Sequence, residues 1–137
     1  MKRLLIIAMS CVALISCSNG EKPKEAITTE KGVVQVLYFH GPQRCATCIA
    51  VEEQTRKELE ADFKNEMENG KITMSSIDFL SDSGEALAEK YEISFSSLIL
   101  DKDGKVIDLT DMAFTYAKTQ PEVFKKQLKQ EIVKLLQ

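Results

Sequence analysis

Two cysteines separated by two residues are the side chains best suited to chemistry in this chain. Cys45 and Cys48 lie between an apolar run at residues 33–39 and a long stretch with helical periodicity. At the start of a helix, residues three apart lie on the same side of the first turn, so the two sulfur atoms can reach bonding distance. The spacing therefore predicts a redox-active pair of thiols.

The two sulfur atoms should differ in reactivity. Cys48 begins the apolar stripe of the expected helix and should be shielded, whereas Cys45 lies where free backbone N–H groups and the positive helix end favour an anion. Arg44 adds a cation beside it. Such surroundings can lower a thiol pKa by a unit or more from its free value of about 8.5. We therefore expect Cys45 to be the nucleophile and Cys48 the resolving thiol.

Two other interpretations of the pair are open. An inert structural disulfide would close so short a loop that it removes little entropy from the unfolded chain. A zinc or copper site would need more ligands than two cysteines, and only His40 and nearby acids could supply them. We expect no bound metal and no cofactor.

The polar residues around the pair have plainer interpretations as well. His40 is the only histidine and could exchange protons with a cysteine, but a strand-end histidine facing solvent or packing against the turn is the simpler assignment. Glu52 and Glu53 are expected to be solvated charges on the helix, although Glu52 could lie near Cys48. The charged residues of 58–64 are expected to form an ordinary exposed face.

The first 16 residues have the pattern of an export signal. Lys2 and Arg3 precede an apolar run at residues 4–15, which is too short to span a bilayer comfortably. The run ends in Leu-Ile-Ser followed by Cys17, which resembles the lipobox of bacterial lipoproteins. The resemblance implies that residues 1–16 are a signal peptide and that Cys17 is the lipid attachment site. An ordinary signal peptide with a chance cysteine is the alternative.

These features predict a lipid-anchored protein of the cell envelope, facing the periplasm or the cell exterior. Cys11 would leave with the signal peptide, so Cys45 and Cys48 would be the free cysteines in an oxidising compartment. Residues 17–31 are polar and contain Gly and Pro, which suits a flexible tether. Ser18, rather than Asp, follows the lipidated cysteine, which favours the outer membrane if the source has two membranes.

Composition limits the rest of the chain to one compact domain, residues 32–137. The 137 residues are 44% hydrophobic and 28% charged, which is enough for a hydrophobic core and too apolar for a disordered protein. The net charge is −3 and no basic stripe is present, so the composition argues against nucleic-acid binding.

The apolar periodicity predicts alternating strands and helices. Strands are expected at residues 33–39, 72–77, 98–100 and 106–109, and helices at 46–68, at 84–91 with an Asp82/Glu85 capping box, and from about Pro121 after Thr119. Asn69-Gly70 should end the long helix and Asp103-Gly104 should form a hairpin turn. A strand–helix–strand start forces a parallel pair, and the hairpin adds an antiparallel edge. The prediction is an α/β sandwich with about four strands.

From about Val33 to its end the chain resembles the thioredoxin family. The matching features are the strand–turn–CxxC–helix order at residues 36–48, Ile77-Asp78, the segment AEKYEI at 88–93, and DGKV at 103–106. The resemblance implies a thioredoxin-like fold of a mixed sheet with helices on both faces, lacking the usual first strand and helix. It also implies thiol–disulfide oxidoreductase chemistry on protein thiols or disulfides, with a redox partner and no cofactor.

The chain departs from the family pattern at several positions around the cysteines. Arg44 replaces a Trp, Ala46-Thr47 replaces Gly-Pro, and Tyr38 replaces a buried acid. Ser96 or Ser97 stands where the family has a cis-proline, so we expect a trans bond, since a non-proline cis bond costs about 2.5–4 kcal/mol. Ser96 could donate a hydrogen bond to a thiolate. The missing cis-proline leaves a second hypothesis open, a non-enzymatic binding module or metal carrier. A third hypothesis is a redox sensor or peroxide-reducing protein.

Overall fold

The computed structural model describes residues 31–137. The expected signal peptide, Cys17 and all but the last residue of the expected tether lie outside the described residues. None of the helices in the described part is long and apolar enough to span a membrane.

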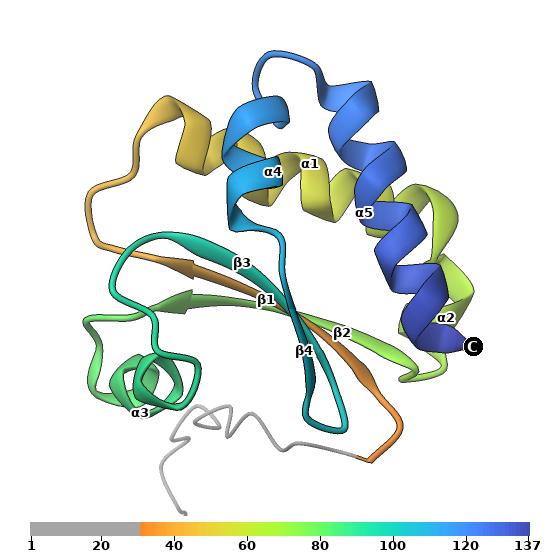
Figure 1. The fold of residues 1–137 in the computed structure, drawn as a ribbon, viewed down its shortest axis with the longest axis horizontal. Helices are drawn as coiled ribbons and strands as arrows, with labels where there is room; N and C mark the ends of the chain where they lie inside the picture. Colours follow the sequence, from red (N-terminus) through yellow and green to blue (C-terminus); the bar gives the residue numbers. More distant parts are fainter. Residues whose placement is uncertain (1–30) are drawn as a thin grey trace, which may run out of the picture.

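A four-stranded mixed sheet forms the centre of the domain (Figure 1). Its strands are β1 (Val34–His40), β2 (Ile72–Asp78), β3 (Ser97–Lys102) and β4 (Lys105–Asp108), in the order β2-β1-β3-β4. β1 pairs in parallel with β2 and antiparallel with β3, and β4 pairs antiparallel with β3. The expected mixed α/β sheet, with its parallel pair and antiparallel hairpin edge, is confirmed.

Helices cover both faces of this sheet, as Figure 1 shows. They are α1 (Ala46–Asp62), α2 (Lys64–Glu68), α3 (Asp82–Lys90), α4 (Thr110–Tyr116) and α5 (Pro121–Leu136). Side chains alternate across β1, so Val36 and Tyr38 join the larger core beneath α1, α4 and α5. Leu37 and Phe39 point to the opposite face and pack against residues in and after α3. Because β1 is buried on both faces, its run of apolar residues follows from its central place.

The single helix expected at residues 46–68 is wrong, because Phe63 divides it. Phe63 leaves the helical conformation, with φ −128° and ψ 22°, and its ring is buried in the core. Its N–H donates to the Leu59 carbonyl oxygen at 3.0 Å, which completes the last turn of α1 before α2 begins. The expected end at Asn69-Gly70 is confirmed, since Gly70 has a positive φ of 70°.

The helix α3 begins earlier than expected, and its cap is Ser81 rather than Asp82. The Ser81 hydroxyl accepts a hydrogen bond from the Gly84 N–H at 3.0 Å and donates to the Asp78 carbonyl oxygen at 2.7 Å. Gly84 packs so tightly against the end of β2 that an added Cβ would lie 2.0 Å from that same carbonyl oxygen. A glycine is therefore required where α3 joins the sheet.

The C-terminal half contains the expected hairpin and the expected last helix, and between them a helix that was not predicted, α4. Asp103 and Gly104 have the positive φ values, 54° and 86°, of the expected hairpin turn. β4 ends at Asp108, so the strand expected to reach residue 109 is one residue too long, and Leu109 turns into the core before α4. α5 begins after Gln120, and its Pro121 lies in the first turn as expected. Thr119 does not cap it, because its hydroxyl donates to the Thr115 carbonyl oxygen.

The expectation of an exposed charged face over residues 58–64 is wrong at Glu58. Glu58 is only 6% exposed, and it lies near enough to Lys125 and Lys129 of α5 for their charges to act on it. Burial raises the pKa of Glu58, and contact with the Asp62 carboxyl adds to the rise. Asp62 itself forms an ion pair with Lys129 of α5 at 2.7 Å.

Glu58→Gln should stabilise the domain at neutral pH. A carboxyl with a raised pKa stabilises the fold while it is protonated, and this contribution disappears as the pH rises through the folded-state pKa. The amide keeps the shape of Glu58 and cannot ionise. We expect Tm to rise by about 3 °C at pH 7 and to stay nearly unchanged near pH 4, as measured by thermal unfolding. Glu60→Gln, at an exposed position of the same helix, is the control; an equal effect of both changes would contradict the prediction.

Candidate active site

The two cysteines lie at the N-terminus of α1, where the chain leaves the tip of β1. Cys45 is the N-cap residue, with the extended φ and ψ of −76° and 162° that this position requires. Its sulfur accepts a hydrogen bond from the Cys48 N–H at 3.1 Å, so a thiol side chain satisfies one of the free donors of the helix. A disulfide joins Cys45 to Cys48, and their Cα atoms are 5.0 Å apart.

The surroundings of the two sulfur atoms differ as expected. Cys45 is exposed, whereas Cys48 is only 7% exposed and faces the core. The first turn of α1 contains no acidic residue, so no carboxylate in that turn cancels the positive end of the helix. An attacking group from outside can reach Cys45 far more easily than Cys48.

Tyr38 ties the start of α1 to the central strand. Its hydroxyl donates a hydrogen bond to the Cys48 carbonyl oxygen at 2.8 Å, and the whole side chain is buried. Burial raises the pKa of Tyr38, while Arg44 and Ser96 act in the opposite direction without cancelling the rise. The hydroxyl therefore stays protonated and remains a donor. Tyr38 is thus a neutral group that holds the backbone of Cys48.

Arg44 does not stand free beside Cys45. Its guanidinium lies over the Tyr38 ring, with 5.7 Å from its central carbon to the ring centroid, and forms an ion pair with Glu52. The expectation that Glu52 is a solvated charge is therefore wrong. Its side chain is 15% exposed and also accepts a hydrogen bond from Arg56 at 3.3 Å. The Arg44 partner is eight residues away and precedes the helix, so helical spacing gave no signal for this pair.

His40 and Ser96 both lie beside Tyr38 rather than against a sulfur atom. The Nδ1 of His40 is 3.0 Å from the Gly41 carbonyl oxygen, and its ring lies 5.9 Å from that of Tyr38. No hydrogen bond within residues 31–137 joins His40 to a cysteine. Ser96 lies close enough to Tyr38 to lower the pKa of its hydroxyl. The described residues contain no cis peptide bond, which confirms the expectation of a trans bond at this loop.

Exposed apolar side chains gather at the sheet edge that carries the cysteines. β1 and β2 end at this edge and β3 begins there, because Phe39 pairs with both Ile77 and Ser97. Three large apolar residues next to these ends are exposed, namely Ile49, Leu80 and Phe95, and Phe95 reaches 65%. Sequence reasoning did not find them. Leu80 and Phe95 lie in short loops, which carry no periodic signal, and Ile49 lies on α1 outside the apolar stripe that was predicted. They give the edge an apolar character that suits contact with another protein.

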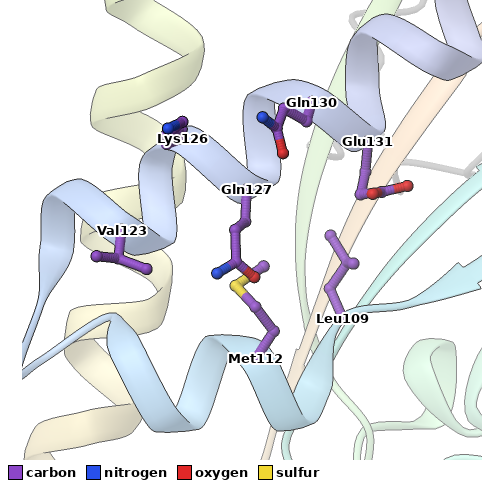
Figure 2. A pocket seen from close by; sticks show the side chains of 7 residues that line it. All are labelled: Leu109, Met112, Val123, Lys126, Gln127, Gln130 and Glu131. Atoms are coloured by element: carbon purple, nitrogen blue, oxygen red, sulfur yellow. The ribbon is translucent and has the colours of Figure 1, made fainter.

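A groove between α4 and α5 lies apart from the cysteines. Figure 2 shows Met112 and Gln127 pointing toward each other across it from the two helices. Its other lining residues are Leu109, Val123, Lys126, Gln130 and Glu131, and none of them belongs to the site around Tyr38. Within residues 31–137, no group of three or more His, Cys, Asp or Glu side chains is placed to hold a metal ion.

Comparisons with known proteins find likeness only among solved structures. No protein-family model matches the chain, and no curated protein matches it either. A thioredoxin of Fasciola hepatica is 18% identical, with 76% of this chain and 82% of that one covered and a TM-score of 0.47. Mitochondrial thioredoxin 3 of Saccharomyces cerevisiae is 18% identical over 74% and 81%, with a TM-score of 0.46. A malarial protein is 24% identical over 69% and 96%, also with a TM-score of 0.46.

The domain has a thioredoxin-like fold. The strand order β2-β1-β3-β4, the single parallel pair, the helices on both faces and the CxxC at the start of α1 carry this assignment. In the described residues the sheet starts with the strand that leads into the cysteines, as expected for a form without the usual first strand and helix. A thioredoxin-like domain with this pair can perform thiol–disulfide exchange, because one sulfur is accessible and its partner is within bonding distance.

After reduction of the disulfide in the thioredoxin-like domain, Cys45 should react with iodoacetamide at least about tenfold faster than Cys48. The cause is the exposure of Cys45 at the positive helix end, against the burial of Cys48. Peptide-resolved mass spectrometry over a time course measures both rates and separates them from other cysteines. The same protein in urea is the control, where the two rates should converge. Equal rates in the folded protein would contradict the assignment of Cys45 as the accessible thiol.

Proposed function

We propose that the protein is a thiol–disulfide oxidoreductase of thioredoxin type that uses Cys45 and Cys48. The observation that carries the proposal is the exposed N-cap cysteine bonded to a buried cysteine one turn into α1. In the reduced protein, the helix N–H groups and the positive helix end would stabilise the Cys45 thiolate. The disulfide closes a loop too short to stabilise the fold substantially, which argues for a chemical role.

The reaction proceeds in two exchanges that conserve electrons. The Cys45 thiolate attacks one sulfur of a substrate disulfide, which forms a mixed disulfide and releases the other substrate sulfur as a thiolate. The Cys48 thiolate then attacks the Cys45 sulfur, which forms the Cys45–Cys48 disulfide and releases the second substrate thiol. Two electrons pass from the pair to the substrate, and the reverse sequence oxidises a substrate dithiol. A redox partner restores the pair after each cycle.

Proteins are the proposed substrates. The apolar side chains of Ile49, Leu80 and Phe95 are exposed at the edge of the sheet where Cys45 lies. Contact with these side chains would hold an unfolded or flexible segment of a partner protein near the sulfur. A small polar disulfide such as glutathione disulfide gains little from such a surface, so we expect it to react more slowly than a protein disulfide.

Cys45→Ser should abolish thiol–disulfide exchange, and Cys48→Ser should stop it at the mixed disulfide between Cys45 and the substrate. Without the nucleophile, reduction of insulin disulfides should fall by at least about a hundredfold. Without the resolving thiol, the mixed disulfide should accumulate and be visible by mass spectrometry. Ala86→Ser, at an exposed position on α3, is the matched control and should keep activity within about twofold. Activity that survives Cys45→Ser would overturn the proposal, and tight stoichiometric zinc or copper binding by the reduced wild type would favour a carrier instead.

We also propose that the protein is exported and anchored in a membrane through lipid on Cys17. The support is the signal-like pattern of residues 1–16 and the lipobox-like end before Cys17, all outside the described residues. The domain would then act in the cell envelope, facing the periplasm or the cell exterior. In a cell with two membranes, Ser18 favours the outer one. An oxidising compartment is also where an exchangeable disulfide is maintained.

Cys17→Ser should remove both lipid and membrane association. In a bacterium that processes lipoproteins, the wild type should incorporate labelled palmitate and sediment with membranes. The matched control is Cys11→Ser, which changes a cysteine within the expected signal peptide and should keep the label. Absence of label from the wild type, or label retained by Cys17→Ser, would show that Cys17 is not the attachment site.

A further inference from the structure

The cation next to Cys45 in the sequence is held by a carboxylate. Arg44 directly precedes Cys45, and its guanidinium forms an ion pair with Glu52, which lies one helical turn beyond Cys48. The Tyr38 ring lies beneath the same guanidinium, at 5.7 Å from its central carbon. Arg44 is thus fixed from two sides while the disulfide is closed.

The carboxylate that holds Arg44 is built into the site. The Glu52 side chain is only 15% exposed, and Arg56 binds its second oxygen at 3.3 Å. Burial alone would raise the pKa of Glu52, but hydrogen bonds from Arg44, Ser76 and Arg56 bring it below its usual value. Glu52 is therefore negatively charged at neutral pH, and its charge is directed at Arg44 rather than at solvent.

This pairing limits what Arg44 can do for a thiolate. Reduction of the disulfide creates a negative charge on Cys45, and a free arginine next to it would stabilise that charge. An arginine already bound to a carboxylate presents little net positive charge at a distance of several ångströms. Cys45 must then rely mainly on the helix N–H groups. A less stable thiolate makes the reduced pair less stable and the disulfide harder to reduce.

We propose that Glu52 is a positioning residue that sets the redox poise of the Cys45–Cys48 couple by withholding the charge of Arg44 from the Cys45 thiolate. The inference rests on the proposed function, because it concerns the same pair. The half-reaction is the addition of two electrons and two protons to the disulfide, giving two thiols. Equilibration with glutathione supplies them, as two glutathione molecules are oxidised to glutathione disulfide.

The test measures the equilibrium constant of the couple against glutathione. E52Q keeps the size of the side chain and removes its charge, so Arg44 becomes free to act on the thiolate. We expect the equilibrium to shift toward the reduced pair by about tenfold, which corresponds to about 30 mV. The Cys45 thiol pKa, measured by alkylation rate against pH, should fall as well. E53Q is the matched control, since Glu53 is an exposed neighbour that takes part in none of the ion pairs within residues 31–137, and it should shift the equilibrium by less than twofold.

A double-mutant cycle decides whether Glu52 acts through Arg44. In an R44Q background, E52Q should shift the equilibrium by less than twofold, because the cation that it releases is absent. A larger shift in that background, or a shift below twofold for E52Q alone, would overturn the inference. Circular dichroism checks that each variant folds. If E52Q does not fold, Glu52→Asp replaces it under the same criteria, because the shorter side chain keeps the charge but reaches less far toward Arg44. A wild-type pair that does not exchange with glutathione at all would instead refute the proposed function.

Discussion

The site depends on how the first turn of α1 is fixed to the central strand. The Cys45 sulfur caps the helix, and the buried Tyr38 hydroxyl donates to the carbonyl oxygen of Cys48. One sulfur is therefore held at the surface and the other inside, by contacts that involve the backbone rather than by the disulfide alone. When the disulfide opens, the Tyr38 contact can persist, so the two thiols stay close enough to bond again.

The same arrangement assigns a structural role to the tyrosine at the position where thioredoxins, which the chain resembles, have a buried acid. Because Tyr38 is protonated, it cannot accept a proton from Cys48 as a carboxylate could. It instead holds the Cys48 carbonyl oxygen and packs against the Arg44 guanidinium. The ionisable acid is found on the helix instead, as Glu52, and it faces Arg44. The charged groups around the pair therefore come from α1 and from the loop before it, as Glu52 and Arg44, rather than from the central strand.

Local sequence patterns predicted the strands, the hairpin and the position of the cysteines well. The apolar run of β1 and the Asp103-Gly104 turn are determined by nearby residues, so a short window of sequence contains the signal. Phe63 divides a helix that its own periodicity would continue, and its ring is still buried in the core, so the periodic pattern carried no signal of the break. α4 was missed because it is short and its N-cap residue, Leu109, has no side-chain acceptor.

Glu52 and Glu58 show why the charges of the site could not be predicted in the same way. Each occupies a helix position that periodicity assigns to solvent. In the folded chain Glu58 is buried and Glu52 is partly covered, in each case by contacts from outside its own stretch of helix. Glu58 is covered where α1 meets α5, and Glu52 is covered by Arg44 from the loop after β1. The identity of a CxxC pair is a local property, but the electrostatic surroundings of its sulfur atoms depend on contacts that only the folded chain forms. Two chains with the same CxxC spacing can therefore differ in redox poise through residues that no motif contains.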